Sequence, residues 1–350
     1  MRALRLHGPR DLRLEDIPEP ALRPGAVKVK VEWCGICGSD LHLFRDAPIP
    51  AAYLHPITNE PGPHTMGHEF AGRVVDAADD VAGLPLGTAV TVEPTLFDAT
   101  CPACRRGEPN LCDVGGFVGI NGWGGGMSDY VVLPADRLHP IPEGISTQTG
   151  SLVEPLAVAW HAVRRSALRP GDSVLVVGAG PIGLGVLIAA KAQGAGLVVV
   201  SEPGAARRKA ALAFGADLAL HPCEHDVVAR VRELTAGRGA DAAFEASGAG
   251  KPAAQALIAS LRKGGRAVTV AAGRPYEFDP NTLMVTEITH TGSLAYDADD
   301  FPSVLTALST GRIQPDGLVS DRIPLERAVH DGFEELLAHP DHHVKILIGL

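Results

Sequence analysis

The stretch WCGICGSDLH, from Trp33 to His42, contains several side chains of the types that bind metals or transfer protons. Cys34 and Cys37 have the spacing of a metal knuckle or of a redox-active pair. A serine, an aspartate and a histidine follow within five residues of the second cysteine. The stretch alone is compatible with a zinc finger, a thioredoxin-like dithiol, or one corner of an active site that is completed elsewhere in the chain.

Candidate partners for a catalytic metal lie in separate parts of the chain. A catalytic zinc takes three protein ligands from cysteine, histidine and carboxylate, and keeps a fourth position for water or substrate. These groups are available from Cys34 or Cys37, from His68 with Glu69 in MGHEF, and from Glu154 in VEPLAV. No thioredoxin-like strand–helix context surrounds the cysteine pair, which disfavours the redox interpretation. Taken singly, each residue also suits an ordinary structural role, such as a packed core histidine or a helix-start carboxylate.

The segment GAGPIG carries the spacing of a dinucleotide-binding turn. Gly178, Gly180 and Gly183 form the G-x-G-x-x-G pattern, with Pro181 and Ile182 between the last two glycines. An apolar strand precedes the motif and a helical stretch follows it, as the motif requires. The glycines allow a tight turn and the close approach of a pyrophosphate to the N-terminus of the helix. The alternative, a purely structural strand–helix turn, leaves the second strand and its acidic end unexplained.

The choice of nicotinamide cofactor depends on the end of the second strand. Glu202 in the segment SEP lies where a carboxylate accepts hydrogen bonds from the adenosine ribose and repels a 2′-phosphate. This predicts NAD. Arg207 and Arg208 follow closely and could instead meet a phosphate, which argues against this preference, and Arg207 is counted among the predicted cofactor-binding residues.

Two halves with different patterns position these groups. Residues 1–150 contain short, alternating strands broken by Gly/Pro turns, which predicts a small β-rich, barrel-like domain; its strands are expected at 27–33, 70–77, 88–92 and 129–134. Residues 151–292 alternate between strand and helix, which predicts a parallel sheet covered on both faces. We expect its strands at 172–178, 196–201, 217–221, 241–246 and 266–272, and helices at 206–214, 226–236 and 251–262. The tail ends on a strand at 344–350 that folds back onto the first domain.

Charge and composition exclude several classes of function. The net charge of −10, without a run of lysines or arginines, disfavours nucleic acid and anionic membranes as partners. The N-terminal segment MRALRLHGPRDLRLE has no apolar core and does not read as a signal peptide. The uncharged run from Val174 to Ala190 contains four glycines and a proline, so it reads as strand, turn and helix rather than a membrane span. We therefore expect a cytoplasmic protein whose six cysteines stay reduced or bind metal.

The motifs GICGSDLH, GHEF, VEPLAV and GAGPIG, in this order, resemble those of the zinc-dependent medium-chain alcohol dehydrogenases. The resemblance covers essentially the whole chain. It implies an α/β protein with a GroES-like, β-rich catalytic domain at 1–150, completed by 293–350, and a Rossmann NAD-binding domain with a six-stranded parallel sheet at 151–292. It also implies an active site in the cleft between the domains and assembly into a homodimer or homotetramer.

The same resemblance assigns roles to individual residues. It makes Cys37 and His68 ligands of the catalytic zinc and leaves Cys34 as a bystander. Glu154 stands where ethanol-active members carry a third cysteine ligand, and Glu69 matches a carboxylate that can enter or leave the metal's coordination shell. Ser39 and His42 match the proton relay, which passes the substrate proton through the cofactor ribose to water. Zinc would act as a Lewis acid on the substrate oxygen, and the carbon would transfer hydride to the nicotinamide.

A second zinc is predicted in the segment DATCPACRRGEPNLC. The family's structural lobe has four cysteines spaced C-x2-C-x2-C-x7-C, and this chain supplies Cys101, Cys104 and Cys112 with Asp98 in the first position. An aspartate oxygen is an acceptable zinc ligand, so Asp98 can complete a tetrahedral site. The alternative is a metal-free loop, in which three exposed thiols would be prone to oxidation.

Three further segments narrow the expected substrate. HPITNEPGPHTMGHEF, GFVGINGWGGGMSDYVVLP and EFDPNTLMVTEITHTGSLAY resemble the butanediol dehydrogenases of this family, which oxidise a vicinal secondary diol and reduce acetoin or diacetyl. Sorbitol and threonine dehydrogenases share the metal pattern and remain alternatives. Zinc-free quinone or enone reductases and structural lens proteins form a different class of alternatives. Proteins of that class are expected to lack the metal ligands, whereas this chain has all of them.

Overall fold

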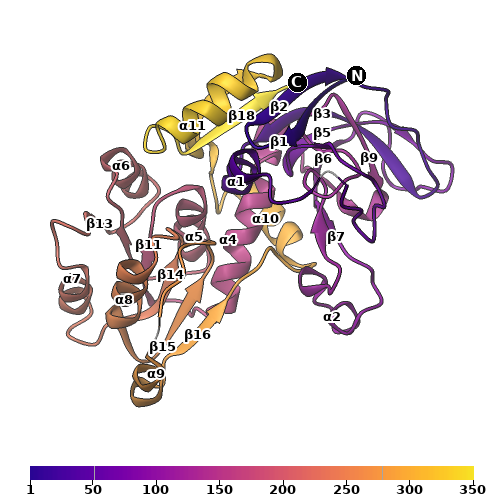
Figure 1. Ribbon diagram of the computed structural model, residues 1–350. Helices are drawn as coiled ribbons and strands as arrows, with labels where there is room; N and C mark the ends of the chain where they lie inside the picture. Colours follow the sequence, from indigo (N-terminus) through magenta and orange to yellow (C-terminus); the bar gives the residue numbers. More distant parts are fainter. Residues whose placement is uncertain (51, 278) are drawn as a thin grey trace. The chain divides into compact units, whose positions relative to one another are not determined.

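The computed structural model describes residues 1–50, 52–277 and 279–350 (Figure 1). The chain divides into two compact units, the first comprising Met1–Glu154, Asp297–Ser309 and Val319–Leu350, and the second Pro155–Tyr296 and Thr310–Leu318. The division predicted at residues 150 and 293 differs from this one mainly in the segment 310–318, which the sequence had placed in the first domain. Arg312 donates a hydrogen bond to the carbonyl of Ala192 at 2.7 Å, which ties this segment to the second unit.

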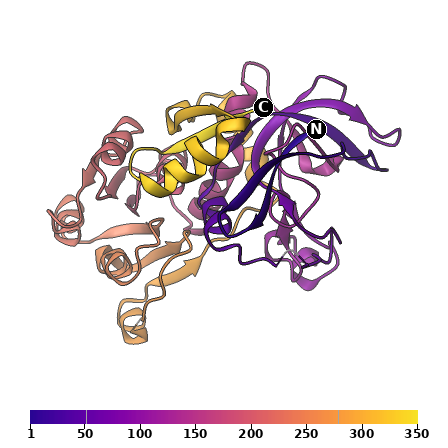
Figure 2. The same cartoon turned by 45° about the horizontal axis from the view of Figure 1, so that its top comes forward.

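A seven-stranded sheet forms the body of the first unit. Its members are β3 (Ala26–Gly35), β5 (Glu69–Ala77), β6 (Ala89–Val92), β9 (Tyr130–Pro134), β10 (Leu138–Pro140), β17 (Val319–Pro324) and β18 (Lys345–Gly349). The central strand β3 pairs antiparallel with β5, β9 and β18. The predicted strands of the first domain are therefore confirmed, as is the return of the C-terminal strand to it. Both chain ends lie close together in the two views (Figures 1 and 2).

Smaller elements complete the first unit. β1 (Arg2–Gly8), β2 (Asp11–Asp16) and β4 (His64–Thr65) form a three-stranded sheet, and β7 (Thr95–Leu96) pairs with β8 (Gly116–Phe117). The helices are α1 (Gly38–Asp46), α2 (Pro102–Arg105), α3 (Thr147–Gly150), α10 (Asp300–Ser309) and α11 (Glu335–Ala338), and α4 (Val153–Arg165) begins at the end of this unit. Short 3-10 helices are η1 (Pro109–Leu111), η2 (Ala135–Arg137) and η4 (Leu325–Arg327), and the π-helix η5 (Ala328–Glu334) precedes α11.

The alternation in β3 explains why this strand lies at the centre of the sheet. Val27, Val29 and Val31 are fully buried, whereas Lys30 between them is exposed. Burying a valine side chain stabilises the folded state by about 1.5–3 kcal/mol, so these three positions hold the strand in register. The ends of β3 and β5 are thereby placed next to each other, which matters for the site described below.

The second unit contains a six-stranded sheet whose neighbours all pair in parallel. In spatial order its strands are β13 (Leu218–Leu220), β12 (Leu197–Ser201), β11 (Ser173–Val177), β14 (Ala240–Glu245), β15 (Leu261–Thr269) and β16 (Thr289–Gly292). This order confirms the six-stranded Rossmann sheet. The residue pattern alone had marked five of these strands. It missed the edge strand β16, which has no buried residue and therefore no apolar signal.

Helices cover both faces of the parallel sheet. They are α5 (Pro181–Ala192), α6 (Ala205–Ala213), α7 (Val227–Leu234), α8 (Lys251–Ser260) and α9 (Pro280–Thr286), and the short η3 (Asp316–Leu318) also belongs to this unit. Figure 1 shows α5 and α6 on one face and α7 and α8 on the other, as right-handed crossovers require. The apolar run from Val174 to Ala190 is β11, a turn and α5, as predicted. Among the described residues no helix is long and apolar enough to cross a membrane.

Candidate functional site

Three potential metal ligands meet where β3 and β5 lie side by side. The ligand atoms of Cys37, His68 and Glu69 lie within 4.8 Å of one another. Cys37 caps the N-terminus of α1, and Glu69 is the first residue of β5. Gly35 at the end of β3 is paired with Glu69, so the two segments that carry the ligands leave the sheet at the same place. A thiol, an imidazole and a carboxylate thus converge on one point, which is a donor set typical of zinc.

Cys34 does not belong to this group. Its side chain is fully buried, and its Sγ lies 3.5 Å from the carbonyl oxygen of Gly35. Burial raises the pKa of the Cys34 thiol well above its ordinary value, which disfavours the thiolate that a metal requires. A methyl group added at Gly67 would come within 2.6 Å of the Cys34 sulfur, so the thiol is closely packed. The structure therefore gives Cys34 a packing position and brings Cys37 to the ligand cluster.

A buried carboxylate orients the imidazole of His68. Asp40 is fully buried, and its Oδ1 lies 3.4 Å from Nδ1 of His68, while its Oδ2 accepts a hydrogen bond from the backbone N–H of Cys37 at 2.9 Å. Burial by itself lowers the pKa of His68, but its interactions with Asp40 and Cys37 together raise the pKa well above its ordinary value. A carboxylate on one ring nitrogen is the usual partner of a metal-binding histidine, because it fixes the ring and increases its basicity. Sequence analysis noted this aspartate in the opening stretch but assigned no role to Asp40.

The two predicted relay residues lie on one side of α1. Ser39 Oγ is 3.2 Å from Nε2 of His68, so the hydroxyl borders the ligand cluster. His42 lies one helical turn further, and residues at this spacing face the same way. Its side chain is 57% exposed, and its Nδ1 lies 3.0 Å from Oδ2 of Asp46. One end of this pair therefore borders the cluster and the other end meets solvent.

Glu69 is held by a lysine from the opposite end of the chain. Lys345 Nζ lies 2.8 Å and 2.6 Å from the two carboxylate oxygens of Glu69, and also donates to the carbonyl of Ile36 at 3.1 Å. The exposed fractions of the two side chains are 2% and 1%. Burial by itself lowers the pKa of Lys345, but the charge and hydrogen bonds of Glu69, together with the charges of Cys37 and Glu154, raise it overall, so the ammonium form is favoured. Sequence analysis read this segment only as a strand; a lysine inside an otherwise apolar strand was the signal that a buried partner exists.

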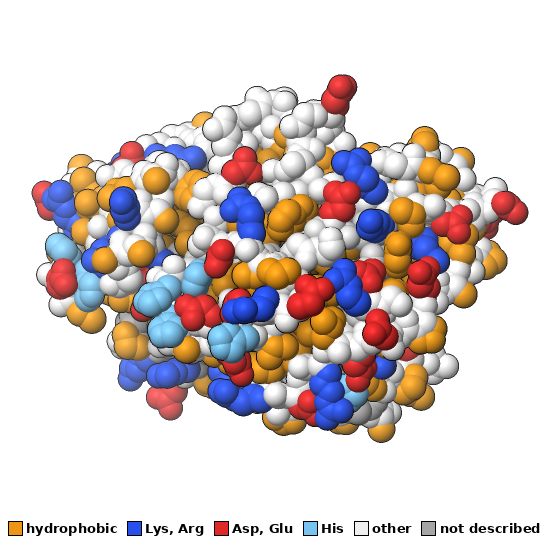
Figure 3. Space-filling view, turned by 90° about the horizontal axis from the view of Figure 1, so that it is seen from above, with side chains coloured by type: hydrophobic (Ala, Val, Ile, Leu, Met, Phe, Trp, Pro, Cys, Tyr) orange, Lys and Arg blue, Asp and Glu red, His pale blue; other side chains and the backbone are white. Residues whose placement is uncertain are grey.

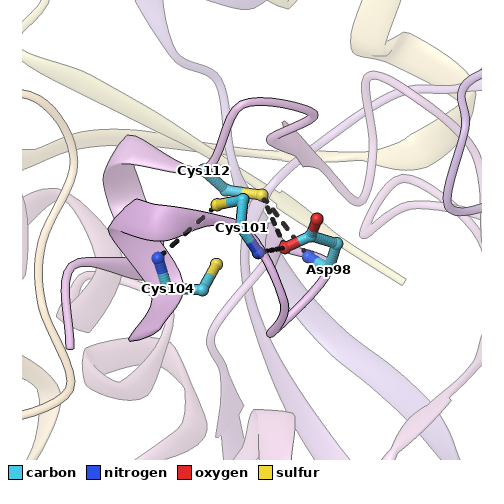
Figure 4. Close-up of side chains that lie close together, drawn as sticks. All are labelled: Asp98, Cys101, Cys104 and Cys112. Atoms are coloured by element: carbon cyan, nitrogen blue, oxygen red, sulfur yellow. Dashed lines mark hydrogen bonds between the residues drawn. The ribbon is translucent and has the colours of Figure 1, made fainter. Parts of the chain in front are cut away.

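A second ligand cluster is formed by the loop around α2. The ligand atoms of Asp98, Cys101, Cys104 and Cys112 lie within 4.8 Å of one another, and Figure 4 shows the four side chains converging. Asp98 Oδ1 accepts hydrogen bonds from the backbone N–H of Thr100 at 2.9 Å and of Cys101 at 3.0 Å. These bonds hold the pKa of the Asp98 carboxyl well below its usual range. The N–H of Cys104 points to the sulfur of Cys101 at 3.5 Å and lowers the pKa of that thiol.

The glycine motif of the second unit has the geometry of a dinucleotide loop. Gly178 follows β11 with φ of +95°, which favours glycine, and Gly180 caps the N-terminus of α5. A methyl group at Gly183 would lie 2.0 Å from the carbonyl oxygen of Gly178, so the third glycine is needed for packing. A methyl group at Gly180 would meet nothing within 4 Å, which leaves open space at the helix N-terminus, where Pro181 and Ile182 begin the first turn. This is the place where the motif receives a pyrophosphate.

Glu202 is tied directly to this loop. It is buried at the end of β12, and its two carboxylate oxygens accept hydrogen bonds from the N–H groups of Ala179 and Gly204, each at 2.7 Å. Of the two arginines considered for the cofactor, Arg208 donates to the backbone carbonyls of Glu202 and Pro203. Arg207 is part of α6, the helix that follows this strand. A fixed carboxylate therefore lies beside the phosphate-binding turn.

Two protein-family models match the chain, the Alcohol dehydrogenase GroES-like domain over residues 23–143 and the Zinc-binding dehydrogenase over residues 181–310. The (R,R)-butanediol dehydrogenase of Bacillus subtilis (strain 168) is 40% identical over 350 residues, which are 99% of this chain and 99% of that protein. The chain belongs to the zinc-dependent alcohol dehydrogenase family. This dehydrogenase is therefore an oxidoreductase, and the resemblance inferred from its motifs is confirmed.

Two further comparisons place the dehydrogenase within its family. The X-ray crystal structure of 2R,3R-butanediol dehydrogenase from Bacillus subtilis matches it with a TM-score of 0.94 and 40% identity, covering 100% of this chain and 99% of that chain. A sorbitol dehydrogenase from Bacillus subtilis (strain 168) is 32% identical over 351 residues, which are 99% of this chain and 97% of that protein. The likeness therefore extends over both units.

The two ligand clusters fit zinc by the chemistry of their donors. The first offers one thiolate, one imidazole and a carboxylate and has an adjacent hydroxyl, which matches a catalytic site with an open position. The second offers three thiolates and a carboxylate, which match a closed, structural site. Sulfur-rich sets of this kind select zinc over magnesium or calcium.

Glu154 occupies a less direct position than the family resemblance implied. It lies in the first turn of α4 and is buried, and its charge contributes to the raised pKa of Lys345. In the described part of the chain, however, the cluster within 4.8 Å contains Glu69 together with Cys37 and His68, and does not contain Glu154. Both carboxylates are thus neighbours of Lys345, which makes the third ligand a choice between them.

Proposed function

We propose that the dehydrogenase oxidises 2,3-butanediol, a vicinal secondary diol, to acetoin with NAD as the hydride acceptor, and catalyses the reverse reduction. The observation that carries the proposal is the full-length likeness to (R,R)-butanediol dehydrogenase of Bacillus subtilis at 40% identity. A matching fold alone would not identify a substrate, because one fold supports many chemistries. The likeness to a sorbitol dehydrogenase at 32% identity makes polyol oxidation the second candidate.

Cys37, His68 and one of the carboxylates Glu69 and Glu154 would hold the catalytic zinc. When bound there, zinc supplies Lewis-acid polarisation of the substrate hydroxyl. Asp40 fixes the His68 ring at Nδ1, 3.4 Å away, and so keeps the donor atoms aligned.

Ser39 and His42 would remove the hydroxyl proton. Ser39 Oγ borders the cluster at 3.2 Å from His68 Nε2, and a hydroxyl can accept one proton while it donates another. His42 is exposed and would release the proton to water, with Asp46 steadying its Nδ1 at 3.0 Å. Proton transfer by positioned groups contributes about 10²–10⁴ in rate, so Ser39→Ala should lower kcat substantially without abolishing the fold.

Glu202 supports NAD rather than NADP. Its buried carboxylate accepts two backbone hydrogen bonds of 2.7 Å and is thereby fixed near the phosphate-binding turn. A 2′-phosphate placed near it would be repelled, whereas ribose hydroxyls could donate to it. Steady-state kinetics with both cofactors test this proposal: a higher kcat/KM with NADP would contradict it. Glu202→Ala should weaken the binding of NAD and narrow the difference in kcat/KM between NAD and NADP.

A substrate panel tests the main proposal. The purified, zinc-loaded enzyme is assayed for NADH formation with the three stereoisomers of 2,3-butanediol, ethanol, sorbitol and threonine. We expect the highest kcat/KM with a butanediol isomer, and the names of the relatives favour the R,R form. Cys37→Ser should abolish turnover, whereas the matched variant Cys34→Ser should retain most of it. A clear preference for sorbitol would support the second candidate instead.

We further propose a homodimer or homotetramer located in the cytoplasm. All six cysteines are free, which agrees with a reducing compartment. Light scattering coupled to size-exclusion chromatography measures the assembly, and a monomer at micromolar concentration would contradict this proposal.

A further inference from the structure

A group of histidines surrounds one carboxylate near the C-terminus. The ligand atoms of Glu335, His339 and His342 lie within 4.8 Å of one another, and His343 is adjacent. His339 Nδ1 is 3.0 Å from Glu335 Oε2, while His342 Nδ1 and His343 Nε2 lie 3.9 Å and 3.2 Å from Oε1. Figure 3 shows histidine side chains gathered among acidic ones on the face that carries α11. The group therefore has the composition of a metal site and is unrelated to the two clusters already described.

Two regular elements hold this group in place. Glu335 is the first residue of α11, and the N–H of His339 donates to the carbonyl of Glu335 at 2.8 Å, which continues the helical turn. The N–H of His342 then donates to the carbonyl of His339 at 3.1 Å, and this turn stacks the two rings with centroids 4.9 Å apart. Lys345 begins β18 directly afterwards. A helix end and a strand start thus fix both ends of the histidine turn.

The three ligand atoms lie close enough together to meet at a single ion. One ligand atom from each of Glu335, His339 and His342 lies within 4.8 Å of the others, with His339 Nδ1 3.0 Å from one carboxylate oxygen of Glu335 and His342 Nδ1 3.9 Å from the other; ligands about 2.0–2.2 Å from a tetrahedral zinc are separated by about 3.3 Å. The side chains of His339 and His342 are 51% and 66% exposed, so an ion from solution reaches them directly. His343 is only 17% exposed and pairs with the same carboxylate, so its imidazole can hold Glu335 in position without itself being open to solvent.

We propose that Glu335, His339 and His342 form a surface site for a transition-metal dication of the zinc class, with His343 as a positioning residue for Glu335. Imidazole nitrogens with one carboxylate favour Zn²⁺, Ni²⁺ and Cu²⁺ over Mg²⁺ and Ca²⁺, which prefer oxygen donors. The site is additional to the two zinc clusters of the family. Binding there fastens the turn that leads into β18, the strand that carries Lys345.

Calorimetric titration of Zn²⁺ into the enzyme with its two family sites already filled tests the proposal. We expect one further equivalent of zinc to bind with a micromolar dissociation constant, and to raise the melting temperature. His339→Ala/His342→Ala should abolish this binding and the thermal shift. His343→Ala should weaken binding by about tenfold, as loss of an outer partner does. Mg²⁺ in place of Zn²⁺ should produce no heat of binding.

His330→Ala is the matched control, because His330 is 79% exposed on the same unit and pairs with Asp331 outside the group. It should leave the additional zinc equivalent unchanged. Activity on the alcohol substrate should also be unchanged in the double variant, which shows that the protein remains folded. Absence of a further equivalent in the wild type, or its full retention in the double variant, would overturn the proposal.

Discussion

The buried pair formed by Glu69 and Lys345 allows a quantitative prediction. Both carboxylate oxygens of Glu69 lie within 2.8 Å of the lysine Nζ, and both side chains are almost inaccessible to water. Lys345→Met keeps most of the length of the side chain and removes the charge. It leaves a buried carboxylate without its partner, which costs far more than the pair itself contributes.

Two estimates of the loss agree. Removing one partner of a buried ion pair lowers the free energy of unfolding by about 3–5 kcal/mol. The structure gives the pair two short charge-assisted hydrogen bonds, and each such bond contributes about 1.5–3 kcal/mol. We therefore expect Lys345→Met to lower the free energy of unfolding by about 3–5 kcal/mol when zinc has been removed by a chelator. The loss should be smaller with zinc bound, because Glu69 can then place its charge near the metal.

Urea denaturation followed by tryptophan fluorescence measures the loss; two of the three tryptophans, Trp33 and Trp123, lie in the first unit and Trp160 lies in the second. Arg73→Met is the control, since the pair of Arg73 with Glu32 is largely exposed and should cost at most about 1 kcal/mol. Glu69→Gln/Lys345→Met removes both charges and should recover most of the stability. A loss below about 1 kcal/mol in Lys345→Met, or strictly additive losses in the double variant, would refute the reasoning.

Three further predictions concern other parts of the chain. Burial by itself raises the pKa of Asp241, but hydrogen bonds from the N and Oγ of Ser173, at 2.9 and 2.8 Å, and the ion pair with Arg262 at 2.6 Å together lower it overall. The contribution of Asp241 to stability is therefore complete above the unfolded pKa of about 3.9 and is lost as the pH falls through the lower folded value. Asp241→Asn should thus be less stable than the wild type at pH 7 by about 1–3 kcal/mol, and the gap between the two melting curves should narrow as the pH falls below about 4; a gap of unchanged size there would contradict this. Gly183→Ala places a methyl group 2.0 Å from the carbonyl oxygen of Gly178 and should distort the turn. Titration with NADH should therefore show weakened binding; an unaltered affinity for NADH would contradict the role of this turn in binding the dinucleotide. Asp98→Ala should lose one zinc per chain by elemental analysis and melt at a lower temperature, whereas Asp98→Cys should keep the metal; equal zinc content in Asp98→Ala would show that the carboxylate is not a ligand.

Local patterns in the sequence were sufficient for most of the fold. The alternating valines of β3 and the continuous apolar run of β11 distinguish a strand buried on one face from a strand buried on both. The edge strand β16 could not be found in this way, because its position beside β15 gives it hydrogen bonds without burial. The segment 310–318 likewise shows no pattern that assigns it to a unit; its contacts with the second unit decide this.

The sites divide in the same way. Cys101 and Cys104 lie one helical turn apart, so their spacing alone brings the two thiols together, and the glycine spacing of GAGPIG similarly specifies a turn. The CxxC spacing does not show whether Cys34 or Cys37 is the metal ligand. That depends on which of the two side chains is buried in the core by β3, and this is Cys34. Glu69 and Lys345 are 276 positions apart and meet only because β18 and β5 both pair with β3. A local sequence pattern predicts contacts between residues of the same turn or strand. Contacts between residues of distant strands depend on which strands become neighbours when the sheet forms.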